Sequence, residues 1–121
     1  MKYKSVIKDG KEVSFKEAEL KFKWLKDASF EDAEINISDD FLVWHSGTWK
    51  DGTWKDGFWG DGTWKYGTWE DGIWENGTWE NGFWEDGNWI NGNWKDGFMW
   101  HNLRQDFVKV KWTGNVFKEL K

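Results

Sequence analysis

The 121-residue chain contains no cysteine and no proline, and it has only two histidines. The absence of cysteine excludes disulfide bonds and thiolate metal sites. No apolar run approaches the roughly 20 residues of a membrane-spanning helix, and the first residues lack the apolar stretch of a secretion signal. The sequence therefore predicts one domain over residues 1–121, in the cytoplasm and without a membrane segment.

The net charge of −5 is unevenly distributed. Residues 1–46 hold eight Lys against ten Asp and Glu, and residues 47–101 hold four Lys against ten. Residues 102–121 hold five Lys and Arg against two, so the three sums are −2, −6 and +3. This mild acidity opposes binding to phosphate backbones, and we expect no direct contact with nucleic acid.

Tryptophan and glycine are abundant, with 14 residues each. From Trp49 to Trp94 a tryptophan occupies every fifth position, in the unit Gly-x-Trp-x-Asp/Asn. In an α-helix a five-residue step turns a side chain by about 500°, and along one strand it alternates faces. A three-residue strand with a two-residue corner keeps every Trp on one face, because Gly supplies positive φ and Asp or Asn bonds to the local backbone. Each unit therefore predicts one side of a coil.

The tryptophans are predicted to face inward. Neighbours in a strand point to opposite faces, so the residues beside each Trp point away from it. They include Lys50 and Glu70, and burying unpaired charge costs far more than exposing an indole. A buried column is therefore favoured over an exposed aromatic platform for sugars or bases.

The segment VSFKEAELKFKWLKDASFEDAEINI, residues 13–37, continues the frame of five with Phe, Leu or Ile at the centre and often Ala two places earlier. With the Trp units, it resembles the pentapeptide-repeat proteins over about residues 13–99. The resemblance implies a right-handed, four-sided β-helix whose central residues face inward. In the later units Gly replaces Ala and Trp replaces Leu or Phe, so the smaller residue compensates for the volume of the larger one.

The predicted fold is all-β: a right-handed, four-sided β-helix (β-solenoid) of about four coils, capped at both ends by hairpin-like segments. The N-terminal cap covers 1–12 and turns at Asp9-Gly10, and the C-terminal cap covers 102–121 and turns at Gly114. Coils cover 13–37 and 47–101, and the frame breaks at 38–46, with a distorted corner at 38–41. The predicted core is Phe15, Leu20, Leu25, Phe30, Ile35, Trp44, Trp49, Trp54, Trp59, Trp64, Trp69, Trp74, Trp79, Trp84, Trp89, Trp94 and Met99.

Charge order supports four sides. Residues stacked in a four-sided coil are 20 apart, which places Lys50 on Glu70 and Lys65 on Glu85. A three-sided coil would place Lys50 on Lys65 and Glu70 on Glu85, at a cost of roughly a few tenths of a kcal/mol per pair.

Few residues indicate chemistry. His45 and His101 lack a second strong ligand at metal or catalytic spacing, and no loop has the order of a phosphate-binding motif. The corner aspartates fit turns better than calcium repeats. We expect no enzyme activity, catalytic residue, metal or cofactor.

The leading interpretation is a non-enzymatic scaffold that presents a rigid surface to a protein partner or to its own copy. Its tentative binding residues are apolar and point outward: Phe58, Phe83, Ile90, Phe98 and Trp100, with Ile73 also outward. The C-terminal segment is expected to cover Phe98 and Trp100. Four-sided stacking would place Phe58 and Phe98 on one side.

Two alternatives remain. Some pentapeptide-repeat proteins mimic DNA and bind type II topoisomerases, and the acidic array allows an inhibitor of that class. Carbohydrate or nucleic-base binding is the further alternative, and it needs exposed indoles. Arrays of this kind also resemble phage and bacterial sequences, which would place the protein in the host cytoplasm if a phage encodes it.

Overall fold

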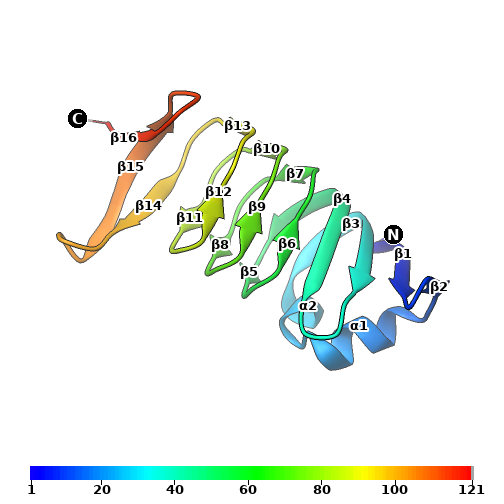
Figure 1. Ribbon diagram of the computed structural model, residues 1–121. Coiled ribbons are helices and arrows are strands. Elements are labelled where there is room, and N and C mark those ends of the chain that lie inside the picture. The colour runs from blue at the N-terminus through cyan, green and yellow to red at the C-terminus, as the bar shows by residue number, and fades with distance from the viewer. Residues whose placement is uncertain (121) are drawn as a thin grey trace.

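Each Gly-x-Trp unit forms a short strand, and the next Asp-Gly or Asn-Gly pair forms a corner. A computed structural model, which describes residues 1–120, shows these units stacked as a β-solenoid of about four coils (Figure 1). At the corners a side-chain oxygen accepts the N–H of the following glycine, as Asp71 Oδ1 does from Gly72 at 2.8 Å. The corner glycines from Gly47 to Gly97 have φ between 114° and 134°, a range that L residues rarely adopt. The predicted β-solenoid, with Trp inside and Gly at the corners, is confirmed.

Each coil has three sides, so the predicted four-sided coil is wrong. Strands pair in parallel with partners 15 residues away, as Thr53 pairs with Thr68 and Phe58 with Ile73. We name the sides by their first indole: side A begins at Trp44, side B at Trp49 and side C at Trp54. Side A comprises the first half of β4 (Leu42–Asp51), β6 (Phe58–Trp59), β9 (Ile73–Trp74) and β12 (Asn88–Trp89). Side B comprises the second half of β4, β7 (Thr63–Trp64), β10 (Thr78–Trp79) and β13 (Asn93–Trp94). Side C comprises β5 (Thr53–Trp54), β8 (Thr68–Trp69), β11 (Phe83–Trp84) and β14 (Phe98–His101).

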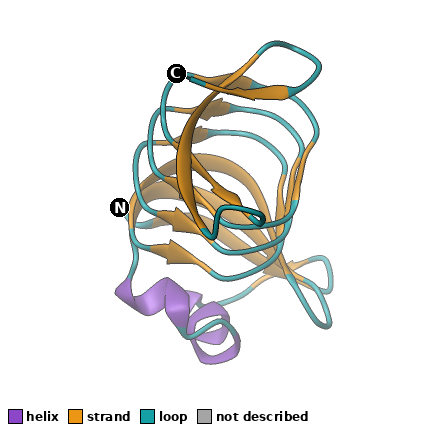
Figure 2. Ribbon diagram, turned by 90° about the vertical axis from the view of Figure 1, so that its left-hand side faces the viewer, coloured by secondary structure: helices purple, strands orange, loops and turns teal. Residues whose placement is uncertain are grey.

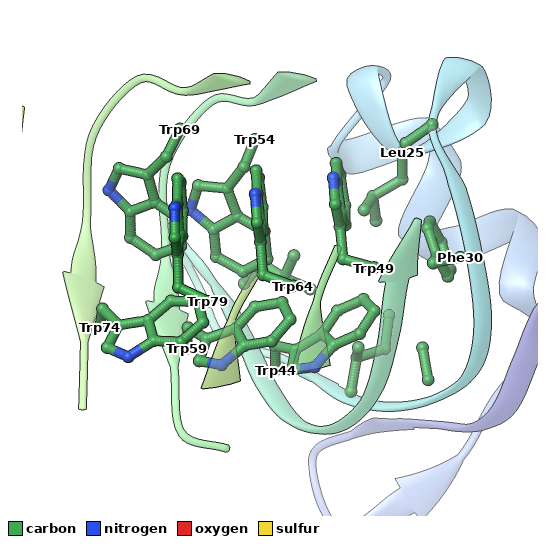
Figure 3. Close-up of a cluster of buried hydrophobic side chains, with 14 of the residues drawn as sticks. Leu25, Phe30, Trp44, Trp49, Trp54, Trp59, Trp64, Trp69, Trp74 and Trp79 are labelled. Carbon is green, nitrogen blue, oxygen red and sulfur yellow. The ribbon is translucent and has the colours of Figure 1, made fainter. Parts of the chain in front are cut away.

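The core is three columns of stacked indoles (Figure 3). Within a column the ring centroids lie 4.7–5.0 Å apart and the planes differ by 3–8°. Successive indoles on different sides meet edge to face at 5.7–5.9 Å from Trp44 to Trp89, and at 5.4 Å between Trp89 and Trp94. The side chains of eight tryptophans, from Trp44 to Trp79, have an exposed fraction of 0%. The three indoles of a coil therefore fill the cross-section of the solenoid.

Aromatic packing explains why three sides are stable despite the charge order. The register does stack Glu70 on Glu85, but Lys55 Nζ lies 3.3 Å from Glu70 Oε2. Lys50 Nζ likewise lies 3.2 Å from Glu31 Oε2. Like charges at an exposed surface cost about a few tenths of a kcal/mol, whereas an aromatic pair contributes about 0.5–1.5 kcal/mol beyond its burial. Packing decides the number of sides.

Glycine at the corners is a packing requirement as well as a conformational one. A Cβ on Gly67 would lie 2.2 Å from the carbonyl oxygen of Gly52, one coil below. A Cβ on Gly77 would lie 3.2 Å from Trp59 Nε1. The indole nitrogens from Trp44 to Trp79, and that of Trp89, are buried and have no hydrogen-bond partner. Their desolvation is a cost that indole stacking offsets.

Residues 15–27 form helices where the five-residue frame predicted coils. Helix α1 (Phe15–Lys21) begins at Ser14, whose hydroxyl accepts the N–H of Lys16, and α2 (Trp24–Asp27) follows directly. In a helix, positions five apart point in different directions, so Leu25 is buried while Phe15 and Leu20 are 46% and 74% exposed. Phe15 and Leu20 are therefore surface residues rather than core. None of the described helices is long and apolar enough to cross a membrane.

The N-terminal segment closes one end of the solenoid (Figures 1 and 2). Strand β3 (Ser29–Ile37) runs antiparallel to β4, and the predicted distorted corner at 38–41 is the turn between them. Phe30 stacks on Trp49 at 5.6 Å, and Trp24 of α2 meets Trp54 at 5.3 Å. Strands β1 (Tyr3–Lys8) and β2 (Lys11–Glu12) form the predicted hairpin beyond β3.

The C-terminal cap is the other predicted hairpin. Strand β15 (Asp106–Trp112) pairs antiparallel with β14 and then with β16 (Phe117–Glu119), and Gly114 lies in the turn with φ of 102°. Trp94 Nε1 donates to the carbonyl oxygen of Val110 at 3.2 Å, and Phe117 meets the Trp94 ring at 4.9 Å. Phe117 also meets the Trp89 ring, at 5.5 Å, so this hairpin contacts the last indoles of sides A and B.

Candidate protein-interaction surfaces

Side A carries a line of apolar side chains that point to solvent. The residue before each inward Trp points outward, and the strand register aligns Val43, Phe58 and Ile73. The next position of this row is Asn88, and Ile90 lies two residues farther along the same strand, in the neighbouring outward row. Ile73 and Ile90 are 37% and 56% exposed, whereas Val43 and Phe58 are half-buried. We call Val43, Phe58, Ile73 and Ile90 the side A stripe. Asn36 and Ile7 continue the row into β3 and β1.

One sequence irregularity shapes the stripe. The position after Trp holds a charged residue in most units, but after Trp59 it is Gly60. Phe58 Cε1 lies 3.7 Å from the place where a Cβ on Gly60 would sit. The absence of a side chain at Gly60 therefore lets the Phe58 ring lie beside its own strand.

Acidic residues border the stripe. Asp56, Asp71 and Asp86 occupy the corner between sides C and A, and Asp61 and Glu75 lie on the other edge of side A. The side A units at 57–61, 72–76 and 87–91 contain no Lys or Arg. Side A is thus an apolar stripe with negative edges.

Side C carries a second aromatic group, which packs on itself. Phe83 stacks on Phe98 at 5.3 Å and meets Phe107 of β15 edge to face at 5.1 Å. Trp100 also meets Phe107, at 5.2 Å, and Tyr66 approaches Phe83 at 6.4 Å. Phe98 and Trp100 face Lys109 and Phe107 in the β14–β15 ladder, so the expected covering by the C-terminal segment is confirmed.

The predicted binding residues thus fall into two groups. Phe58 and Ile90 lie on side A, and Phe83, Phe98 and Trp100 lie together on side C, so the placement of Phe58 and Phe98 on one side is wrong. The three-sided register joins Val43 to Phe58, a neighbour that stacking by 20 does not reveal. Counting the same sequence in steps of 15 aligns Val43, Phe58 and Ile73 and then reaches Asn88, two residues before Ile90.

Side C also has an acidic groove of about 590 Å³, lined by Lys55, Glu70, Asp71, Glu85, Asp86, Trp100 and Asn102. Partial burial raises the pKa of Glu85, and the charge of Glu70 in the same column raises it further. The charge of Lys55 lowers the pKa of Glu85, but the Lys55 ammonium is paired with Glu70, at 3.3 Å. The groove therefore concentrates negative charge on one flank of the solenoid.

Side B is polar. Thr48, Thr63, Thr78 and Asn93 align along it, and Lys50, Lys65, Glu80 and Lys95 form the adjacent row. It has no outward apolar residue among these positions. Side B therefore supplies matched control positions for side A.

The indoles of the array form the core, and Trp89 is the one among them that is half-buried. Within residues 1–120, no three His, Asp or Glu side chains are grouped so that they could hold a metal ion. The chain matches no protein-family model, no curated protein and no solved structure. The surfaces themselves are therefore the basis for a functional proposal.

Proposed function

We propose that this protein is a non-enzymatic scaffold that binds a protein partner through the side A stripe. The observation that carries the proposal is the outward row of Val43, Phe58 and Ile73, with the exposed Ile90 in the neighbouring row, on an otherwise charged surface. Aligned apolar side chains that point to solvent are typical of interfaces. The stacked core beneath holds them rigidly, which lowers the entropy lost on binding.

Phe58 is the expected centre of this interface. Its aromatic ring lies between two aliphatic neighbours in the row, and binding energy usually concentrates in a few central aromatic anchors. The carboxylates at the edges would mainly set association rate and salt dependence. A partner with apolar residues and a basic rim fits this pattern.

Affinity capture with matched variants tests the proposal. Wild-type protein, Phe58→Ser/Ile73→Ser and the side B control Thr63→Ser/Thr78→Ser would be immobilised, and proteins captured from host lysate identified by mass spectrometry. We expect a protein that the wild type and the side B control retain and the side A variant loses. Equal capture by all three, with all three shown to be folded by circular dichroism, would contradict a role for side A.

An acidic DNA mimic is the second candidate, and the aligned Asp56, Asp71 and Asp86 beside Glu70 and Glu85 favour it. It rests on kinship with pentapeptide-repeat proteins, which we propose on the five-residue unit alone. Inhibition of a type II topoisomerase in a supercoiling assay is the test. Inhibition that Asp71→Asn/Glu85→Gln/Asp86→Asn abolishes and Phe58→Ser/Ile73→Ser preserves would support the mimic over the scaffold.

A further inference from the structure

The last strand of side A, β12, has an open edge. It ends the order of its sheet and pairs only with β9 among the described strands. One coil lower, the carbonyl oxygens of Gly72 and Trp74 accept the N–H groups of Asn88 and Ile90 at 2.9 and 2.8 Å. Since alternate residues of a parallel strand bond to opposite neighbours, the N–H and C=O of Trp89 and the C=O of Gly87 point away from β9.

The chain itself turns away from this edge. A further coil would place residues 103–105 above β12, but Gln105 donates its N–H to the His101 carbonyl at 2.8 Å, and Arg104 N donates to His101 Nδ1. Leu103 is consequently 93% exposed. These bonds form a tight turn that directs the chain into β15 instead of into another coil.

The unit at this edge differs from the others. Every unit of the array between residues 47 and 96 contains a charged residue except 87–91, which reads GNWIN. Exposed strand edges are usually protected by charge, because an open edge invites another strand to pair. This edge lacks that protection, and Ile90 beside it is 56% exposed.

A groove lined by both aromatic and polar residues adjoins the open edge. It has a volume of about 370 Å³ and lies against Gly87, Asn88 and Trp89, and its other wall includes Trp112, Val116 and Phe117. Trp89 is the one indole of the array that is only half-buried. Phe117 and Trp112 meet the Trp89 ring edge to face, with centroids 5.5 and 6.1 Å away, so the groove beside Trp89 is bounded by three aromatic rings and suits one more.

From this juxtaposition we propose that the β12 edge and its groove bind an extended segment of a partner protein by strand addition. The segment carries one aromatic residue between uncharged neighbours. Its backbone pairs with Gly87 and Trp89, and its aromatic side chain lies in the groove against Trp89, Trp112 and Phe117. Backbone pairing supplies affinity and the groove supplies specificity, as in other strand-addition complexes. This site is separate from the side A stripe.

The probe is a dye-labelled, end-blocked peptide with the sequence of residues 87–92, GNWING, which reproduces the unit that contains β12. Its affinity for the full chain would be measured by fluorescence anisotropy, and amide hydrogen exchange by NMR. We expect slower exchange of the Trp89 amide on binding, with little change at Ile90, whose N–H is already bonded. A peptide with Ala in place of Trp should bind at least about tenfold more weakly.

Two matched variants locate the site. Val116→Glu adds a charge at the groove, where Val116 is 52% exposed, and should weaken binding by at least about tenfold. Leu103→Glu adds the same charge outside the groove and should change the affinity by less than about twofold. Phe58→Ser/Ile73→Ser should bind the peptide as the wild type does, which distinguishes failure of this site from failure of the side A proposal.

Other results overturn the inference. Unchanged exchange at Trp89, or equal binding of the Trp and Ala peptides, would show that the edge does not accept a strand. Dimers in concentrated protein, with the Trp89 amide protected in the absence of peptide, would identify a second copy as the occupant. No detectable peptide binding would equally reject the proposed strand addition.

Discussion

Trp59 and Trp74 lie face to face, with ring centroids 4.8 Å apart and planes 6° apart. Trp89 covers the other face of Trp74 at 4.9 Å, so Trp74 lies between two parallel indoles. This relationship, repeated in three columns, holds successive coils together. It also determines which substitutions the protein tolerates.

Trp74→Ala should lower the free energy of unfolding by about 3–5 kcal/mol, because it opens a large cavity and removes two stacking partners. Trp89→Ala is the comparison, since Trp89 is only half-buried and stacks on one indole. Trp89→Ala should lower the free energy of unfolding by less than Trp74→Ala does, with a difference of roughly 1 kcal/mol or more. Urea unfolding would measure both, and equal losses would contradict a column that encloses Trp74 and ends at the half-buried Trp89.

Gly67→Ala should be far more damaging than Gly114→Ala, although both glycines have positive φ. Each change incurs about 1–2 kcal/mol for an L residue in that conformation. At Gly67 the new Cβ would also lie 2.2 Å from the Gly52 oxygen, whereas nothing lies within 4 Å at Gly114. We expect Gly67→Ala to cost at least about 3 kcal/mol in thermal unfolding, or to prevent folding. A similar melting temperature for both variants would refute the close contact between coils.

Lys55 and Glu70 should be energetically coupled, because Nζ and Oε2 are 3.3 Å apart across adjacent coils. A double-mutant cycle with Lys55→Ala and Glu70→Ala should give about 0.3–0.5 kcal/mol at low salt, and less at high salt. The control cycle pairs Lys55 with Glu75, the neighbour that a four-sided coil would require. Coupling in the second cycle and none in the first would contradict three sides.

Glu85→Gln should stabilise the protein at pH 7. Burial and then Glu70 raise the pKa of Glu85 in the folded state, so the charged carboxylate weakens folding above that pKa. As the pH falls, protonation removes this penalty, and below the unfolded pKa the variant should have no advantage. We expect the variant to raise the free energy of unfolding by roughly a few tenths of a kcal/mol at pH 7. Urea unfolding at pH 7 and at a pH below the unfolded pKa would measure this difference. A constant difference across the range would show that the charge of Glu85 is not its source.

Much of the local structure is predictable from the sequence. The Gly-x-Trp-x-Asp/Asn unit indicates a strand and a corner, and the charges beside Trp require the indole to face inward. The hairpins at Asp9-Gly10 and Gly114 follow from turn residues between alternating segments. Residues 14–17, Ser-Phe-Lys-Glu, also form a helix-start pattern that the five-residue frame obscured. These features depend on neighbours in the chain.

The number of sides, and with it the candidate site, depends on tertiary packing. A strand and a corner repeat every five residues whether a coil has three sides or four, so the period alone does not distinguish them. The choice depends on how indoles from different sides meet, and edge-to-face contacts of 5.7–5.9 Å fill a three-sided section. That packing places Phe58 between Val43 and Ile73, and it makes β12 the last strand of its sheet. The sequence by itself determined the five-residue strand and corner. The packing of indoles from different units decided which surface residues meet, because the energy of aromatic packing exceeds the cost of stacking like charges at an exposed surface.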